Sequence, residues 1–172
     1  MRTTILILAV VIFNALSMNV NAQLKPLTDK EKEKLKTFKS IDQAKENADA
    51  VEALFLNYAK LTEFPKEMSL FKKMIIFDLG GNSIKEIPVF IFDLTNIQEF
   101  GISHNQISVI PVEISKLKNL VAFKMWNNQI TKVPDELLSL PNLQVLELKG
   151  NPIPKEEKDR IKKKFPKLKI LF

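Results

Sequence analysis

Apolar residues recur with a period of 23 along the chain between residues 51 and 142. Four full units follow one another in register, 51–73, 74–96, 97–119 and 120–142, and a fifth begins at residue 143 and departs from the pattern after residue 151. Positions 1, 4, 6, 11, 14, 18 and 21 are apolar in all four full units. Self-similarity at a fixed period of this length is typical of a repeat architecture in which neighbouring units share one core.

The apolar pattern predicts one short strand in each repeat. Apolar residues at positions 4 and 6, with variable residues at 3, 5 and 7, alternate as a half-buried strand does, and like-oriented units place their strands in a parallel sheet. Position 15 is proline in every full unit: Pro65, Pro88, Pro111 and Pro134. Because proline fixes φ and lacks a donor, it suits the start of a short helical or 3-10 segment on the return path.

Position 9 carries a ladder of asparagines, Asn82, Asn105, Asn128 and Asn151, with Ala59 as the exception in the first unit. A buried asparagine can both donate to and accept from backbone groups of a turn, so we expect this ladder to be structural and to begin at the second repeat. In particular, Asn128 is expected to be buried, and its neighbour Asn127 to face solvent.

These repeats closely resemble the leucine-rich repeat family in its 23-residue form, L-x-x-L-x-L-x-x-N-x-L-x-x-L-P-x-x-I-x-x-L-x-x, over residues 51–153. The resemblance implies an α/β fold: a leucine-rich repeat solenoid with a short parallel β-sheet on the concave face and short helical or 3-10 segments on the convex face. It also implies protein recognition without enzymatic activity. Since a solenoid exposes its core at both ends, we expect helical caps there.

Residues 23–50 are the expected N-terminal cap. Thr28 to Glu31 and Ser40 to Gln43 both have capping-box spacing, and Phe38, Ile41 and Ala44 lie on one face of a predicted helix. Residues 154–172 are the expected C-terminal cap, with a helix from Lys155 to Phe165 and then an extended segment with alternating apolar residues.

The first 22 residues have the pattern of a secretory signal: a basic Arg2, an apolar run from Ile5 to Phe13, and small residues before a predicted cleavage site between Ala22 and Gln23. The apolar run is too short to span a bilayer, so we expect a secreted or periplasmic protein without stable membrane insertion. The export signal and the short cysteine-free repeats favour a bacterial source.

Charge and composition narrow the classes of partner. The formal net charge is +6, but the excess of lysine and arginine lies in residues 155–172, so the repeats are nearly neutral and no nucleic-acid groove is expected along them. The basic end is interpreted as a solvated helix face. No cysteine is present, which excludes disulfides and thiolate sites, and we expect no cofactor and no metal.

The variable strand positions predict the binding surface. Positions 3, 5 and 7, flanked by 2 and 8, should face the concave side, and the single tryptophan, tyrosine and histidine all fall at positions 7 or 8. The pattern itself asks for no aromatic residue there, so these side chains indicate a surface for a protein or peptide, or for a glycan. The candidate partner-binding residues are Phe55, Tyr58, Ile76, Asp78, Glu99, His104, Lys124, Trp126 and Asn127.

Two other functions remain open. Asp78, Ser103 and His104 are the residue types of a hydrolytic triad, although adjacent Ser and His on one strand should point apart. A structural or self-associating envelope or surface protein is the other alternative: we expect a monomer, but Phe90 and Phe92 beside Ile91 either fill a gap in the core or form a dimer contact.

Overall fold

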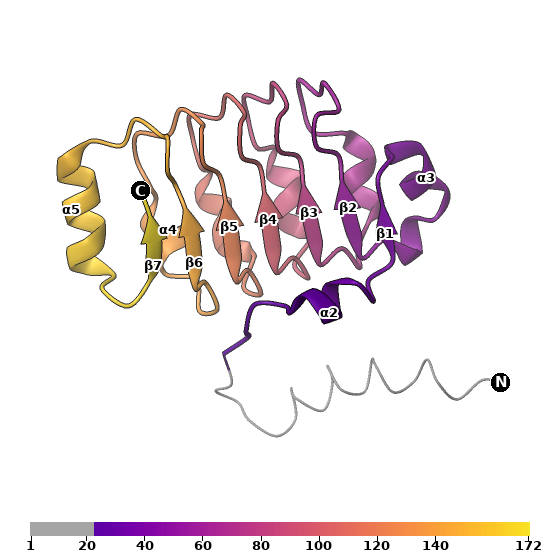
Figure 1. Cartoon of the computed structure of the whole chain (residues 1–172), viewed down its shortest axis with the longest axis horizontal. Coiled ribbons are helices and arrows are strands. Elements are labelled where there is room, and N and C mark those ends of the chain that lie inside the picture. The colour runs from indigo at the N-terminus through magenta and orange to yellow at the C-terminus, as the bar shows by residue number, and fades with distance from the viewer. Residues whose placement is uncertain (1–22) are drawn as a thin grey trace.

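The computed structural model, which describes residues 23–172, is a solenoid built on one parallel sheet of seven strands in chain order (Figure 1). Adjacent repeats pair one period apart, so that Ala53 lies opposite Ile76 and Ile76 opposite Glu99. The predicted strand of every repeat is therefore confirmed. The strands are β1 (Thr37–Phe38), β2 (Ala53–Phe55), β3 (Ile76–Asp78), β4 (Glu99–Gly101), β5 (Ala122–Lys124), β6 (Val145–Glu147) and β7 (Lys169–Leu171).

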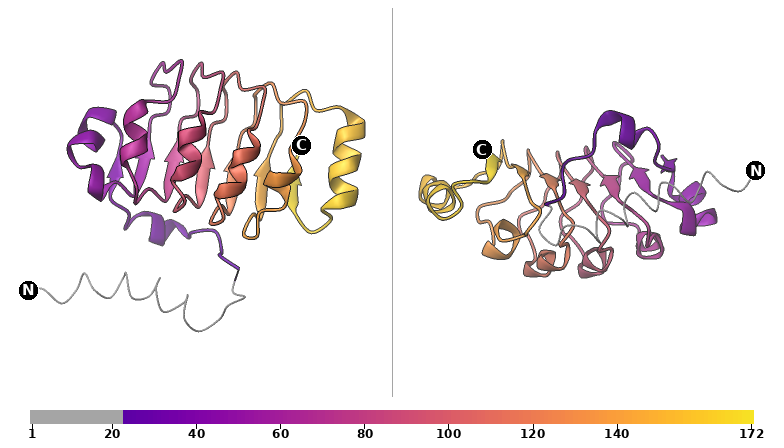
Figure 2. Two further views of the ribbon diagram at one scale, coloured as in Figure 1. Left: turned by 180° about the vertical axis from the view of Figure 1, so that it is seen from behind. Right: turned by 90° about the horizontal axis from the view of Figure 1, so that it is seen from below.

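Short helical segments form the convex side, and each begins directly after the proline at position 15 (Figure 2). They are the 3-10 segments η2 (Lys66–Leu70), η3 (Val89–Asp93) and η4 (Val112–Lys116) and the α-helix α4 (Asp135–Leu138). The prolines have extended or near-extended ψ, as expected for residues that start a helical turn.

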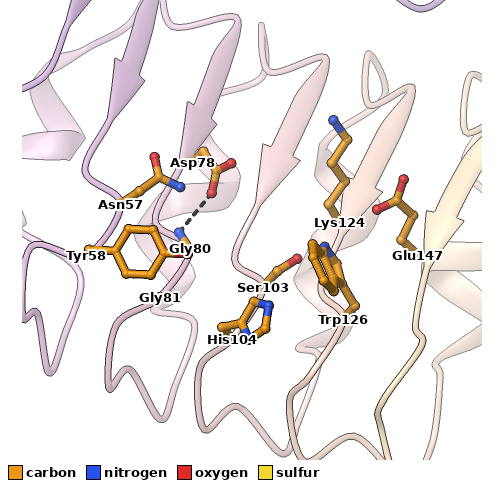
Figure 3. Close-up of a pocket in the computed structure, with 10 residues that line it drawn as sticks. All are labelled: Asn57, Tyr58, Asp78, Gly80, Gly81, Ser103, His104, Lys124, Trp126 and Glu147. Carbon is orange, nitrogen blue, oxygen red and sulfur yellow. Dashed lines mark hydrogen bonds between the residues drawn. The ribbon is translucent and has the colours of Figure 1, made fainter.

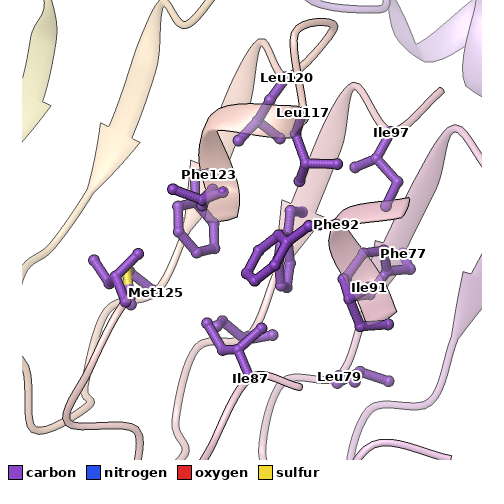
Figure 4. Packing of buried hydrophobic residues seen from close by; sticks show 14 of the residues in the cluster. Phe77, Leu79, Ile87, Ile91, Phe92, Ile97, Leu117, Leu120, Phe123 and Met125 are labelled. Carbon is purple, nitrogen blue, oxygen red and sulfur yellow. The ribbon is translucent and has the colours of Figure 1, made fainter. Parts of the chain in front are cut away.

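The core lies between the sheet and the convex segments and contains the apolar positions of the repeat (Figure 4). Position 4 forms a stack of phenylalanines under the sheet: ring centroids are 4.2 Å apart for Phe77 and Phe100 and 4.6 Å apart for Phe100 and Phe123. Aromatic pairs at these distances add attraction beyond the burial of their area. The second, third and fourth repeats are thereby joined to one another.

Phe92 belongs to this core. Its side chain is fully buried, and Phe90 is half-buried and packs against the same cluster. Figure 4 shows Phe92 among the labelled core residues, with Leu117, Ile91 and Phe123 around it. The interpretation that these residues fill a gap in the core is therefore correct. The alternative, a dimer contact through both phenylalanines, is wrong, because Phe92 has no solvent-exposed surface.

Two asparagine ladders hold the turns. Asn128 Nδ2 donates to the Ile102 and Met125 carbonyls at 3.0 and 3.1 Å, and its Oδ1 accepts from the Ile107 N–H at 3.0 Å. Asn105 does the same one repeat earlier, which confirms the predicted ladder. A second ladder at position 23 was not predicted: Asn96, Asn119 and Asn142 each donate to a backbone carbonyl of the preceding repeat.

The N-terminal cap differs from the expectation. Helix α3 (Ile41–Glu46) and the 3-10 turn η1 (Ala48–Ala50) cover the first repeat, but Phe38 lies in β1 rather than on a helical face. The capping box at Thr28 and Glu31 is present, whereas Ser40 makes no capping hydrogen bond through its side chain. Phe38 joins the sheet because its backbone pairs with Leu54 of the first repeat.

Residues 23–36 run across the concave side along the edge at which the strands begin (Figures 1 and 2). We call this segment the strap; it includes the short helix α2 (Asp29–Lys32). Its far end is fixed by the Leu24 N–H, which donates to Asn142 Oδ1 at 2.8 Å. Asn142, which belongs to the asparagine ladder at position 23 of the repeat, thus also anchors the strap, 118 residues away in the chain.

The C-terminal cap forms as expected, with helix α5 (Lys155–Lys164) followed by β7 against β6. Ile161 is buried on the inner face of α5. Arg160 donates to Asp135 at 2.6 Å and to Glu157 at 2.7 Å, and Lys164 also pairs with Asp135, so part of the basic charge is paired. Lys155, Lys162 and Lys163 are exposed. None of the helices described from residue 23 onward is long and apolar enough to cross a membrane.

Candidate functional site

A hollow of about 350 Å³ lies on the concave side where β2 to β6 end (Figure 3). We call it the exit pocket. The side chains around it come from positions 5, 7 and 8 of successive repeats, which the strand alternation places on this face. Its lining residues are Asn57, Tyr58, Asp78, Gly80, Gly81, Ser103, His104, Lys124, Trp126 and Glu147.

Two aromatic side chains stand at opposite sides of the exit pocket. Tyr58 follows β2 and is 77% exposed, and Trp126 follows β5 and is 39% exposed. Figure 3 shows the glycines of the second repeat and Ser103 between them. The prediction that these rings are displayed rather than packed in the core is therefore confirmed, as are the burial of Asn128 and the exposure of Asn127.

Position 8 has a backbone requirement that the repeat pattern does not reveal. Its residue has positive φ in every repeat: Tyr58 (56°), Gly81 (70°), His104 (54°), Asn127 (53°) and Gly150 (76°). Glycine and asparagine adopt this left-handed conformation readily, whereas other residues are strained in it. The repeat pattern by itself indicates no requirement at position 8, whereas the backbone there does favour glycine or asparagine. The presence of glycine or asparagine at this position in three of the five repeats could have indicated it.

Tyr58 and His104 keep this conformation despite its cost. Strain of this kind clusters at binding and catalytic sites, and an observed outlier supports a functional hypothesis. The ring of Tyr58 lies over Gly81, where a Cβ atom would come within 2.4 Å of Tyr58 Cε1. Glycine at position 81 therefore provides the space that the exposed ring occupies.

Trp126, His104 and Asn127 form one cluster at the far side of the exit pocket. The His104 and Trp126 rings pack edge to face with centroids 4.7 Å apart. Asn127 Nδ2 lies 3.3 Å from both ring nitrogens of His104. These contacts restrict the rotamers of the indole and the imidazole, so the cluster presents a partly ordered surface.

Asp78 is held in place by its neighbours. Its Oδ1 accepts from the Gly80 N–H at 2.8 Å, and the carboxylate occupies space beside Gly101, where a Cβ would meet Asp78 Cγ at 2.6 Å. Among the described residues Asp78 makes no ion pair. One carboxylate oxygen is thus committed to the backbone, and the other remains available to a partner.

Two of the candidate residues are not displayed. Ile76 and Glu99, both at position 3, are 4% and 7% exposed. The strap covers this end of the strands, and Lys32 Nζ lies 2.7 Å from Glu99 Oε1. The expectation that position 3 contributes to the binding surface is therefore wrong, because a segment outside the repeats occupies it.

Phe55 and Lys124, at position 5, are half-buried and line a second hollow of about 130 Å³ between the strap and the exit pocket. Lys124 Nζ lies 3.8 Å from Glu99 Oε2. The surface of the concave face that stays open consequently begins at position 5 and extends to position 8.

The geometry does not assemble a hydrolytic triad. Ser103 is buried, and its Oγ has no hydrogen-bond partner, whereas His104 points toward Trp126 and Asn127. A nucleophile needs its base within hydrogen-bond reach, and these two side chains face different neighbours. In residues 23–172 no group of three or more histidine or acidic side chains is arranged to hold a metal ion.

The parallel sheet, the convex turns and the repeated asparagines define a solenoid repeat protein with an open concave face. Comparisons with known proteins give the family. A family model described as leucine rich repeat matches residues 95–153. Together with the fold, this match shows that the repeats of the chain are leucine-rich repeats.

Several solved structures share this fold. A leucine-rich repeat protein of Leptospira interrogans is 38% identical with a TM-score of 0.52, over 66% of this chain and 35% of that one. Internalin C2 of Listeria monocytogenes is 24% identical with a TM-score of 0.58, over 69% and 50%, and shows the fold alone. A chain of the BIR3–SERK2 complex of Arabidopsis thaliana is 27% identical with a TM-score of 0.53, over 63% and 61%.

None of the curated proteins compared with the chain matches it. The chain spans about a third of the length of the Leptospira protein and half of the length of internalin C2. No enzymatic family was found, and leucine-rich repeat folds are usually not catalytic.

Proposed function

We propose that this protein is a non-enzymatic binding module, secreted or periplasmic, that recognises a protein or peptide through the open part of its concave face. The observation that carries the proposal is the display of the chain's only tryptophan and only tyrosine around the exit pocket. Tyrosine and tryptophan are the residues most enriched at energetic hot spots of interfaces.

The strain at Tyr58 supports the same conclusion. A residue that is 77% exposed contributes little to the core, yet this tyrosine occupies a left-handed position that glycine would fill at lower cost. Stability alone does not account for this choice, whereas contact with a partner does. The structure of BIR3 with SERK2 shows that a protein of this fold forms a complex with another protein.

The proposed location rests on the pattern of residues 1–22, which lie outside the described part of the structure. N-terminal sequencing of the protein from its native source is the direct test. A mature chain that begins at Gln23 supports export, and one that retains Arg2 removes this part of the proposal.

Affinity capture tests the binding surface. The purified protein is used to capture partners from extracellular or envelope fractions, beside the variant with both Trp126→Ala and Tyr58→Ala. We expect each truncated aromatic to weaken capture by about 1 kcal/mol or more, with nearly unchanged thermal stability. The matched control is Val89→Ala with Val112→Ala, since these two apolar side chains are half-exposed on the convex side. Capture that survives loss of both rings would exclude the exit pocket as the binding surface.

A further inference from the structure

We infer that the exit pocket binds a cationic side chain, arginine or lysine, of an extended peptide segment in the partner. This inference rests on the proposed function and names the chemistry that the pocket recognises. Carboxylates that lack a cation, two aromatic walls and one buried hydroxyl support it.

On the concave face, one carboxylate has two lysines nearby, and two other carboxylates form no ion pair among the described residues. Glu99 has Lys32 at 2.7 Å and Lys124 at 3.8 Å, so both lysines are already directed to one buried carboxylate. Asp78 and Glu147 line the exit pocket, and neither has a lysine or arginine nitrogen within 4.0 Å among the described residues. Lys124 also lines the pocket, and its Nζ lies 3.8 Å from Glu99 Oε2. The pocket therefore presents two carboxylates to one lysine, and a cationic ligand can neutralise the excess negative charge.

Asp78 is the stronger anchor of the two. The Gly80 N–H fixes one of its oxygens and Gly101 leaves room for the group, so binding costs little side-chain ordering. A guanidinium or ammonium group would form a hydrogen bond with the free oxygen in which both partners are charged, so it would also neutralise the carboxylate, which a neutral donor cannot do. This favours a cation over a sugar hydroxyl.

The aromatic walls suit the same ligand. A cation over the face of tryptophan or tyrosine is attracted by the quadrupole of the ring. Tyr58 and Trp126 are three strands apart, which corresponds to about 14 Å at the usual strand spacing. An extended peptide rises about 3.3 Å per residue, so roughly four residues fit between the two rings.

Ser103 provides an unsatisfied polar group in the floor of the pocket. The residue is 7% exposed, and its Oγ is buried without a hydrogen-bond partner. A buried hydroxyl without a partner is costly, so a ligand that can bond to it gains affinity. A main-chain or side-chain polar group of the peptide would supply this bond while the cation engages Asp78.

The single tryptophan makes the test direct, because Trp126 fluorescence reports on this pocket alone. The probes are acetyl-Gly-Arg-Gly-Gly-amide and its citrulline counterpart, which has nearly the same shape but no charge. We expect a saturable change in fluorescence with the arginine peptide at millimolar concentration, and binding of the citrulline peptide that is weaker by about tenfold or more. Added salt should weaken the arginine peptide selectively.

Asp78→Asn is the matching variant, because an asparagine oxygen can still accept from the Gly80 N–H while the charge is lost. We expect it to reduce affinity for the arginine peptide about tenfold. Asp93→Asn is the control: Asp93 lies on η3 of the convex side and pairs with Lys116. This variant should bind like the wild type.

Equal binding of both peptides, or an arginine response that is insensitive to Asp78→Asn, would overturn the inference. A response to the neutral sugar cellotetraose without one to the arginine peptide would overturn it in favour of a carbohydrate ligand. These results can be distinguished from results that would contradict the proposed binding function. If partner capture needs Trp126 and Tyr58 but is unaffected by Asp78→Asn, the binding surface stands and only the cationic ligand is wrong.

Discussion

The His104 imidazole packs edge to face against the Trp126 indole, with 4.7 Å between the ring centroids, from a backbone position whose φ is +54°. The contact exists because the left-handed turn at the end of β4 directs the side chain of position 8 toward the next repeat. Tyr58 and Asn127 lean over the following glycine in the same way. The open edge of the concave face is thus formed by the residues at position 8, all of which have positive φ.

This strain is measurable at His104. His104→Ala and His104→Asn both remove the ring, but only asparagine tolerates positive φ well. We expect the asparagine variant to be more stable than the alanine variant by about 1 kcal/mol, which corresponds to a difference of roughly 2–4 °C in Tm for a chain of this size. Thermal unfolding followed by circular dichroism compares the two. Identical midpoints would show that the left-handed backbone costs little here.

Adjacent asparagines in the fourth repeat should differ sharply in their effect on stability. Asn128 satisfies three buried backbone groups, so Asn128→Ala leaves them unpaired and should cost about 3 kcal/mol or more. Asn127→Gly removes an exposed side chain at a position where φ is positive and should change stability by about 0.5–1 kcal/mol at most. Urea unfolding gives both values. Similar losses in the two variants would contradict the structural role of the ladder.

The strap should depend on Lys32. Lys32→Ala removes the closest cation of the buried Glu99, whose other lysine is 3.8 Å away. Because one partner of a largely buried pair is lost, we expect destabilisation of about 1–3 kcal/mol and faster amide exchange in residues 29–36. Lys30→Ala, an exposed change in the same short helix, is the control. Unchanged exchange in the Lys32 variant would mean that the apolar contacts of the strap are sufficient.

The C-terminal cap should make stability depend on pH. Hydrogen bonds from Arg160 lower the pKa of Glu157 in the folded protein, and the Val133 N–H adds to this. A carboxylate with a depressed pKa stabilises the fold above its ordinary value of 4.5, and this contribution is lost as the pH falls through the folded value. The wild type should therefore exceed Glu157→Gln in stability at neutral pH.

That difference should shrink as the pH is lowered below 4.5. Urea unfolding of both proteins at a series of pH values measures it. Glu156→Gln, in the exposed first turn of the same helix, should show no comparable change. A constant gap between wild type and Glu157→Gln across the acid range would exclude the proposed linkage.

The sequence alone determined the repeat and its local consequences. The 23-residue period identified the strands, the buried apolar positions, the buried Asn128 and the display of Trp126, because alternation along a strand fixes the face of each side chain. The family resemblance came from the same period, and the C-terminal cap was predicted from the helical and alternating apolar residues that follow it. These features depend on neighbours within one or two repeats.

Only the tertiary structure decided which part of the concave face is open. Ile76 and Glu99 are buried at the end of the strands along which the strap runs, and Lys32 of the strap pairs with Glu99, 67 residues away in the chain. A contact between a repeat and a non-repeating segment leaves no periodic signal. Phe92 was likewise assigned to the core only by its packing. Periodicity specifies the side to which a residue points, but what covers that side depends on where the rest of the chain lies.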